Sequence, residues 1–143
     1  MKQMDYNGNG KSEVLYYYSD GGFGVAVVNV RGCHPCGYVT FPGIETIKDY
    51  ENVYPWHENS NDKCIGPHYG FTFLGTMKHL GLEERWIGWD YGHIDDYVQH
   101  GPIESDANWY DDGKKWTTEE VVNEAYDILR FIKNGWFVID EES

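Results

Sequence analysis

A near-continuous apolar run, Phe23–Arg31 (FGVAVVNVR), constrains the fold of this chain more than any other segment. Strands covered on both faces carry such runs, whereas half-exposed strands alternate apolar and polar residues. The run follows Asp20-Gly21-Gly22, a turn signal, because glycine takes a positive φ without steric cost. The aromatic segment Glu13–Ser19 precedes the turn, so residues 1–31 are expected to form an N-terminal hairpin.

Further strands are expected after this hairpin. The segment Cys36–Phe41 is ended by Pro42-Gly43, and Arg85–Asp90 and Trp136–Ile139 also have strand-like compositions. Aromatic alternation over Tyr69–Leu74 predicts a strand with Tyr69, Phe71 and Phe73 on one face and His68, Gly70 and Thr72 on the other. Residues 44–67 and 91–116 are loop-rich, and such long loops are usually functional or mobile.

The clearest helix covers Thr118–Lys133. The pattern Thr117-x-x-Glu120 is a capping box, and Gly135 is the expected residue just after the helix. One apolar stripe at helical period follows the cap, formed by Val121, Val122, Ala125, Ile128, Leu129 and Ile132. The sequence therefore predicts an α+β fold, in which an antiparallel sheet carries one main C-terminal helix on a face, and a single domain over residues 1–143.

The charge of the chain is large and unevenly distributed. There are 24 acidic and 11 basic residues, which gives a net charge of −13. Residues 1–82 hold 8 acidic and 6 basic residues, whereas residues 83–143 hold 16 and 5. Nucleic acids and anionic membranes both require a basic face, so neither is an expected partner. An anionic ligand would take its donors from residues 1–82, which carry four of the six histidines, and the acidic part can equally be a solubilising face.

The cysteines and the N-terminus predict a cytoplasmic protein. The N-terminal MKQMDYNGNGK lacks the apolar core of a secretory signal, and the chain has no run of about 18 apolar residues that would span a membrane. The odd number of cysteines, Cys33, Cys36 and Cys64, favours free thiols. With His68 they have the spacing of four zinc ligands, and this alternative stays open. We expect no metal and no cofactor. A redox pair would need a strand-to-helix junction, whereas strand-like residues follow Cys36.

The densest group of chemically capable residues lies between Arg85 and Asp96. A strand leads there into a glycine-containing turn that carries Asp90, His93, Asp95 and Asp96. A carboxylate and an imidazole within one turn suit general acid–base catalysis, in which the carboxylate fixes the imidazole tautomer, or binding of a divalent metal. The purely structural alternative is that Asp90 caps the turn and hydrogen-bonds to His93.

Other candidates are spread along the chain. Gly70, beside His68 and Thr72, would let a ligand approach the backbone. Arg31, at a strand end, is the best single candidate for binding phosphate, and no P-loop or G-x-S-x-G motif is present. Aromatic residues make up 17% of the chain, and rings at a pocket rim can stack on a nucleobase. The rings considered as ligand contacts are Tyr38, Phe73, Trp86 and Trp89.

Several of these segments together resemble a family of small phage-encoded proteins. That family carries, in order, C-x-GYV, an HGG-(L/I)-T-(Y/F) strand, a W-x-GFD-x-AH-x-GD strand and turn, and a helix that opens near Y-V-x-x-E. The corresponding segments here are Cys36–Val39, His68–Phe73, Trp86–Asp96 and Glu120–Glu124. The chain departs from the family pattern at Tyr69, Trp89, Gly92 and Asp95. The resemblance covers residues 36–133, so the N-terminal hairpin lies outside it.

The resemblance implies a counter-defence protein in the cytoplasm of an infected bacterium, with a small nucleotide-derived immune signal as its partner. The matched residues expected to contact this ligand are His68, Thr72, Trp86, Asp90, His93 and Asp96. The preferred interpretation is that the protein binds and sequesters a cyclic or conjugated ADP-ribose, with surplus rings and Arg31 supplying contacts. Whether copies of the chain associate is left open.

Two alternatives come from other functional classes. The first is a hydrolase of a cyclic nucleotide, with His93 as general base, Asp90 orienting it and His68 as general acid. The second is an acidic decoy that binds a basic host protein through a patch formed by Glu104, Asp106, Asp111 and Asp112. Product analysis separates the hydrolase from a sequestering protein, and steep salt dependence would mark the decoy.

Overall fold

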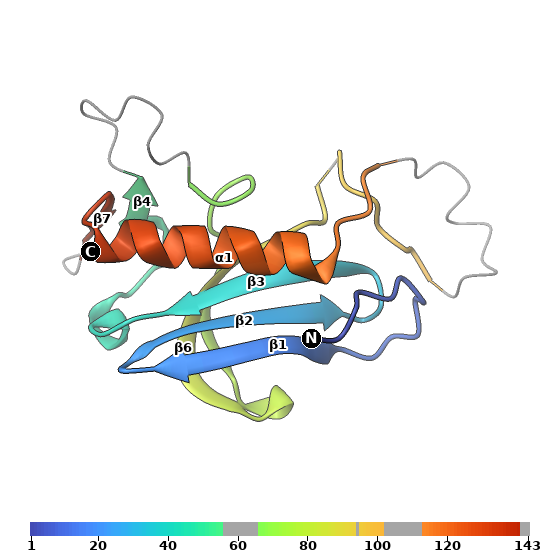
Figure 1. Cartoon of the computed structure of the whole chain (residues 1–143), viewed down its shortest axis with the longest axis horizontal. Coiled ribbons are helices and arrows are strands. Elements are labelled where there is room, and N and C mark those ends of the chain that lie inside the picture. Colours follow the sequence, from blue (N-terminus) through green and yellow to red (C-terminus); the bar gives the residue numbers. More distant parts are fainter. Residues whose placement is uncertain (56–65, 94, 102–112, 141–143) are drawn as a thin grey trace.

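The computed structural model describes residues 1–55, 66–93, 95–101 and 113–140, and its main element is a five-stranded antiparallel sheet (Figure 1). The strand order is β1-β2-β3-β6-β5. The bounds are β1 Glu13–Asp20, β2 Phe23–Val30, β3 His34–Thr40, β5 Phe73–Met77 and β6 Leu82–Asp90. Helix α1, Thr118–Lys133, packs on β1, β2 and β3. The predicted α+β fold, with one C-terminal helix on a face of the sheet, is confirmed.

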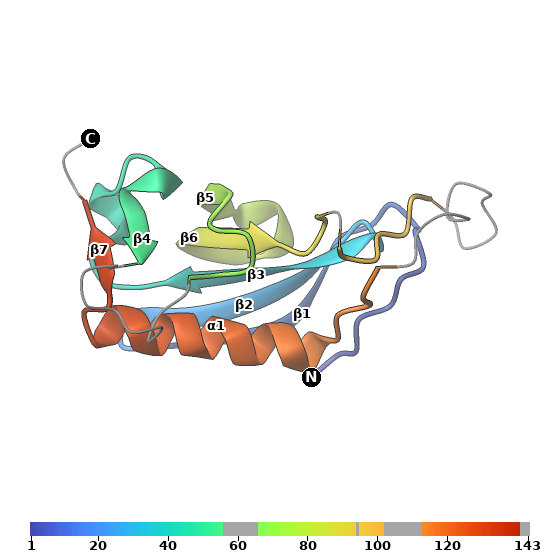
Figure 2. The ribbon, with the colours of Figure 1, turned by 90° about the horizontal axis from the view of Figure 1, so that it is seen from above.

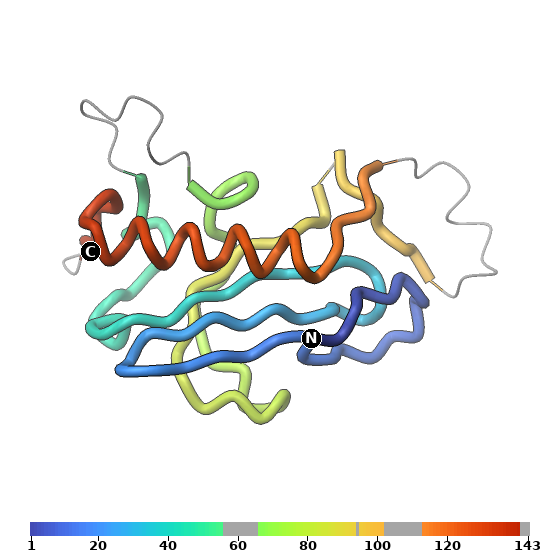
Figure 3. The backbone as a smooth tube through the Cα atoms, in the orientation of Figure 1, coloured from blue at the N-terminus to red at the C-terminus, as the bar shows by residue number. Residues whose placement is uncertain are grey.

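A second, two-stranded sheet lies beside the end of α1. Strand β4, Val53–Pro55, pairs antiparallel with β7, Phe137–Ile139, which follows the helix (Figure 3). Short 3₁₀ helices connect the strands, η1 at Ile44–Thr46, η2 at Tyr50–Asn52 and η3 at Lys78–Leu80. The final strand is thus confirmed, and β4 is an addition that the sequence did not indicate. Within the described residues, no helix is long and apolar enough to cross a membrane.

The apolar run of β2 is buried on both faces of the sheet, as predicted. Val25 and Val27 lie in the core beneath α1, whereas Ala26 and Val28 lie in a second core on the opposite face. The second core also contains Cys36, Tyr38, Met77, Leu82 and Trp86. Figure 2 shows α1 along one side of β1–β3, with β5 and β6 on the other side. Because β2 pairs with β3 along its whole length, the N-terminal hairpin is an integral part of the sheet.

The strand predicted at Tyr69–Leu74 is wrong in its first half. Tyr69 (φ 57°) and Gly70 (φ 87°) have left-handed backbone conformations, which an extended strand cannot contain. The strand β5 therefore starts only at Phe73. Phe71 packs in the core beneath α1 and Phe73 packs against the second core, so the predicted shared face of Tyr69, Phe71 and Phe73 is also wrong.

The predicted capping box of α1 is confirmed. Thr117 Oγ1 accepts a hydrogen bond from the Glu120 amide at 3.2 Å, and Glu120 Oε1 accepts one from the Thr117 amide at 3.0 Å. Gly135 follows the helix with φ 76°, the conformation that suits glycine at this position. All six residues of the apolar stripe are buried, which explains why α1 lies flat on the sheet.

Glu120 gives the helix start a pH dependence that can be measured. Burial raises the pKa of Glu120, but Lys114, at 2.7 Å, and the hydrogen bonds from Thr117 outweigh it, so the pKa lies below its usual value. Such a carboxyl stabilises the fold above its unfolded-state pKa of about 4.3, and this contribution disappears as the pH falls through its lower folded-state value. We expect Glu120→Gln to lower the free energy of unfolding at pH 7, and the deficit to vanish in acid.

Urea unfolding of wild type and Glu120→Gln between pH 7 and pH 3 measures this deficit. Glu119→Gln is the matched control, because Glu119 is an exposed neighbour that carries the same charge. A deficit that stays constant across this pH range would contradict the assigned role of the Lys114 ion pair.

Candidate functional site

The candidate site lies where β6 ends, between the turn at residues 66–72 and the start of α1. Backbone hydrogen bonds hold residues 91–99 against the beginning of β3: the Tyr91 amide donates to Pro35 O at 3.1 Å, and the Gln99 amide donates to Cys33 O at 2.9 Å. A parallel bridge between Asp96 and Lys114 then ties this segment to the residues before α1. Four segments that are distant in the sequence therefore meet at one place. They are the start of β3, the turn at residues 66–72, the segment after β6 and the residues before α1.

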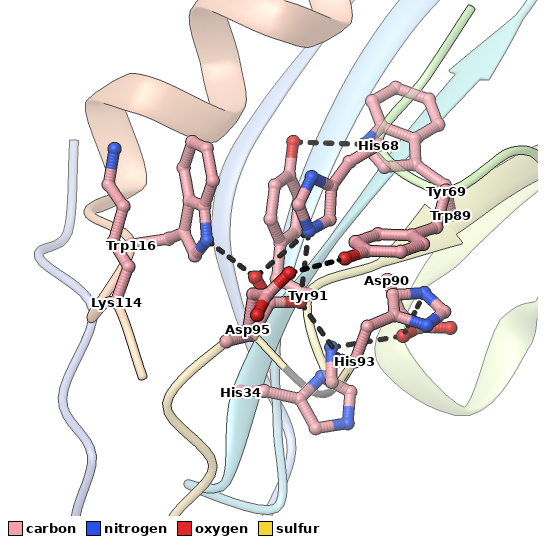
Figure 4. Close-up of polar contacts among 12 residues, drawn as sticks. His34, His68, Tyr69, Trp89, Asp90, Tyr91, His93, Asp95, Lys114 and Trp116 are labelled. Atoms are coloured by element: carbon pink, nitrogen blue, oxygen red, sulfur yellow. Dashed lines mark hydrogen bonds and ion pairs between the residues drawn. The ribbon is translucent and has the colours of Figure 1, made fainter. Parts of the chain in front are cut away.

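Asp96 is the centre of the site. Its residue is only 3% exposed, and a buried carboxylate needs hydrogen-bond donors. His68 Nε2 lies 2.9 Å from both carboxylate oxygens, Trp116 Nε1 donates to Oδ1 at 2.8 Å, and the His93 amide donates to Oδ2 at 2.9 Å. Figure 4 shows His68, His93 and Trp116 coming together from separate segments. Asp96 thus fixes both His68 and the backbone of His93.

Helix α1 holds the His68 side of the site through Tyr91 and Glu124. The His68 ring stacks on the Tyr91 ring, with centroids 4.7 Å apart and planes 13° apart. The Tyr91 hydroxyl donates to Glu124 on α1, and the other carboxylate oxygen of Glu124 accepts from the His68 amide at 3.2 Å. Burial, and then Glu124, raise the pKa of Tyr91, so this phenol stays protonated. His68 therefore has little freedom to rotate.

His93 forms a second imidazole–carboxylate pair with Asp90. His93 Nε2 lies 3.2 Å from Asp90 Oδ1, and Asp90 itself accepts hydrogen bonds from Thr72 Oγ1 at 3.1 Å and from the Gly92 amide at 3.0 Å. The Nε2 atom is buried and has no aligned hydrogen bond within the described part of the chain. The contact with Asp90 is thus electrostatic, and it is strongest when His93 is protonated.

Tyr69 covers His93 from the solvent side. The two rings are stacked, with centroids 4.3 Å apart and planes 24° apart, and the Tyr69 hydroxyl donates to Asp95 Oδ2 at 2.8 Å. This hydrogen bond raises the pKa of Tyr69. The residue is 55% exposed, so one face of a large ring is presented to a ligand directly above the imidazoles.

The arrangement places two imidazoles, each beside its own carboxylate, with ring centroids 5.9 Å apart. A carboxylate only accepts hydrogen bonds, so the Asp96 contact favours the tautomer of His68 that carries its proton on Nε2. The His68 side chain is 17% exposed and that of His93 is 27% exposed, so both are partly accessible. Two such groups on either side of a reacting bond can take up one proton and deliver another.

The structure brings together half of the sequence-predicted site residues. His68, Thr72, Asp90, His93 and Asp96 lie in the cluster just described. The others lie elsewhere: Arg31 is in the β2–β3 turn near Ser12, Tyr38, Phe73 and Trp86 belong to the second core, and Trp89 is buried beneath α1. Trp89 still supports the site indirectly, because its Nε1 donates to the Tyr91 hydroxyl at 3.0 Å.

Sequence reasoning did not predict roles at the site for several residues. They are Tyr69, Tyr91, Trp116 and Glu124, together with His34, whose ring borders Gly92 beside Asp90. Glu124 had a usable signal, because a carboxylate between the apolar positions Val121 and Ala125 borders the buried stripe of the helix. No local pattern in the sequence connects Trp116 to Asp96.

The cysteines show neither a redox pair nor a zinc cluster in the described residues. Cys33 and Cys36 are free thiols, and no three His, Cys, Asp or Glu side chains in the described ranges gather as metal ligands. Cys64 lies outside those ranges. Cys36 is only 6% exposed, and its burial, followed by the charge of Asp90, raises the pKa of the thiol to about 12.

This raised pKa predicts that the Cys36 thiol resists alkylation. The thiolate is the reactive form, so in a Cys33→Ser/Cys64→Ser variant we expect almost no labelling by iodoacetamide at pH 8. Complete labelling is expected after unfolding in urea, and mass spectrometry measures both. The matched control keeps Cys33 alone, which is more exposed and should be labelled in the folded protein. Rapid labelling of native Cys36 would contradict the buried, protonated thiol.

No protein-family model, curated protein sequence or solved structure matches this chain. The resemblance to phage-encoded proteins therefore stays a prediction. The acidic patch of the decoy hypothesis, at residues 104–112, lies outside the described residues.

Proposed function

We propose that this protein is a hydrolase that cleaves a cyclic-nucleotide signal by general acid–base catalysis. The observation that carries the proposal is the pair of imidazole–carboxylate contacts, His68–Asp96 at 2.9 Å and His93–Asp90 at 3.2 Å, with the two rings 5.9 Å apart. The two rings are in edge-to-face contact, and a hydrogen bond spans about 2.6–3.2 Å, so both imidazoles can reach oxygens of a single phosphodiester group. The nucleotide class of the substrate comes from the phage resemblance.

The reaction assigns one proton transfer to each histidine. His93, the more exposed ring, takes a proton from a water molecule as the water oxygen attacks phosphorus. His68 delivers a proton to the leaving ribose oxygen as the P–O bond breaks and that oxygen takes the electron pair. The product is a linear phosphomonoester, and exchange with solvent restores both histidines. Asp96 positions His68, and Asp90 provides the charge that stabilises protonated His93.

The charge around the site favours this reaction over simple anion capture. Arg31 lies in the β2–β3 turn, where its amide donates to Ser12 Oγ at 3.1 Å, and Lys114 is paired with Glu120 at 2.7 Å. Among the described residues that form the two imidazole–carboxylate pairs, His68 and His93 are the side chains that can carry a positive charge. A site of this kind suits transient binding during proton transfer, whereas tight sequestration benefits from permanent cations.

One observation favours sequestration as a second candidate function. The exposed ring of Tyr69 is held flat over His93 and is fixed at its hydroxyl by Asp95, at 2.8 Å. Such a ring can stack on a nucleobase, which contributes about 1–3 kcal/mol. Binding through this ring does not require the ligand to be cleaved. Both candidate functions therefore involve the same ligand, which is hydrolysed in the first and stays intact in the second.

The deciding experiment follows the chemical state of the nucleotide. Cyclic mono- and dinucleotides and cyclic ADP-ribose are incubated with the protein, the protein is denatured, and the nucleotides are separated by chromatography. Hydrolysis predicts a linear product that disappears in His93→Ala and persists in His79→Ala, because His79 is an exposed histidine of η3 outside the site. Quantitative recovery of intact ligand that had been bound would establish sequestration, and neither binding nor cleavage would refute both functions.

A further inference from the structure

A cavity next to the histidine cluster has no role in the proton transfers. Its volume is about 380 Å³, which falls within the range of small-molecule sites. It lies between η2, strand β4 and the turn at residues 66–71, and it is lined by Tyr50, Glu51, Tyr54, Pro55, Pro67 and Phe71, among others. We propose that this cavity binds a guanine base of the substrate. The inference rests on the proposed function and adds the identity of the base.

The cavity and His68 lie on either side of the turn at residues 67–70. Pro67 and Gly70 line the cavity, and His68 and Tyr69 between them belong to the catalytic cluster. The Gly70 amide donates to Pro67 O at 2.8 Å, which closes the turn and holds the two sides together. A nucleotide whose phosphate contacts His68 can therefore place its next bulky group across this turn, in the cavity. In a nucleotide, that group is the base.

The walls of the cavity suit a flat aromatic ring. Tyr50, Tyr54 and Phe71 supply aromatic side chains, and the Phe71 ring packs against the rings of Trp89 and Phe137, each with centroids 5.9 Å away. Tyr54 is 44% exposed although it lies in a strand, so part of its ring surface at the cavity edge is open to a ligand. Stacking on such rings accepts any base, so the rings explain affinity but not specificity.

Specificity is assigned to Glu51. Glu51 is one of the residues that line the cavity, and a carboxylate offers two acceptor oxygens and no donor. Guanine presents two adjacent donors on its Watson–Crick edge, N1–H and the 2-amino group, and a carboxylate can accept from both. Adenine presents an acceptor, N1, at the same place, and a carboxylate repels it. The negative charge at this position therefore selects guanine over adenine.

The first test compares the cleavage of three cyclic dinucleotides that contain guanine, hypoxanthine or adenine. Hypoxanthine keeps N1–H and lacks the 2-amino group, so the expected order of kcat/KM is guanine, hypoxanthine, adenine. Hydrogen bonds to charged groups are stronger than neutral ones by about 1–1.5 kcal/mol, so Glu51→Gln should reduce the guanine preference about tenfold. Glu45→Gln, at an exposed carboxylate outside the cavity, is the matched control and should keep the preference.

The second test uses guanosine, which has no phosphate and does not need the histidines. Calorimetry should detect guanosine binding to wild type and to His93→Ala, and weaker binding to Glu51→Gln and Tyr54→Ala. Guanosine binding without cleavage of any nucleotide would uphold the cavity and refute the hydrolase. Cleavage with equal kcat/KM for guanine and adenine substrates, or equal binding of guanosine and adenosine, would overturn the guanine assignment.

Discussion

Asp96→Asn should abolish most of the nucleotide hydrolysis while leaving a folded protein. The carboxylate accepts from His68 Nε2, from Trp116 Nε1 and from the His93 amide. An asparagine side chain has one acceptor oxygen and an NH₂ group, so it must turn a donor toward at least one of these donors. His68 then loses both its partner and its fixed tautomer. Losing a positioned acid or base typically lowers the rate by about 10²–10⁴-fold.

The measurement is the rate of linear product formation, together with a urea unfolding curve for the same variant. The buried unpaired donor should lower the free energy of unfolding by about 1–3 kcal/mol, so the two effects are separable. Asp95→Asn is the matched control, because Asp95 is an exposed neighbour with the same charge whose carboxylate accepts from the Tyr69 hydroxyl. A folded Asp96→Asn protein that cleaves within threefold of wild type would remove His68 from the mechanism.

The largest effect on stability is expected at Trp89. This side chain is 1% exposed in the core beneath α1, and its indole covers the backbone of Gly37 on the neighbouring strand. Truncation of a buried tryptophan to alanine costs about 3–5 kcal/mol, because a cavity remains where the ring was. Domains of this size have total stabilities of about 5–15 kcal/mol, so Trp89→Ala should shift the urea midpoint strongly or unfold the chain.

Gly37 provides a test of the same contact that does not depend on complete unfolding. A Cβ atom at Gly37 would lie 2.6 Å from Trp89 Cζ2, closer than real side chains allow. Gly37→Ala should cost about 1–3 kcal/mol in wild type and clearly less in a Trp89→Leu background. Gly75→Ala is the control, because its Cβ would meet only the Phe73 ring at 3.3 Å. Equal costs in both backgrounds would show that Trp89 and Gly37 are not coupled.

The parts of the fold that could be predicted are those that local sequence determines. The capping box at Thr117 and the apolar stripe define α1, because both act within a few residues of the chain. The run in β2 predicts burial on both faces for the same reason. Strand β4 has three residues and pairs with β7 more than 80 positions away, so no local pattern marks it. Tyr69 takes φ 57°, a conformation that sequence patterns rarely indicate for a residue other than glycine.

The candidate site could be predicted where its chemistry is clustered in the sequence. Asp90, His93 and Asp96 lie within one turn, and that proximity alone indicated them. The pairing of His68 with Asp96 depends on the turn before β5 and on the bridge to Lys114, which are long-range features. Trp86 and Trp89, which were also predicted as ligand contacts, are 0% and 1% exposed and lie in the two cores outside the cluster. A high aromatic content shows that many rings are present, but the position of each ring in the sheet determines whether it is buried or exposed to solvent.

Helix α1 supplies Glu124, which fixes Tyr91 and the backbone of His68, and the residues just before it supply Trp116. Ribosomes synthesise proteins from the N-terminus, so β1–β3, His68 and His93 are made before this helix. A nascent chain would therefore carry both histidines with Asp90 and Asp96 before Trp116 and Glu124 are available to hold them. Under the proposed function, protein that is still being translated should be inactive toward the nucleotide, and activity should begin only once the helix has docked.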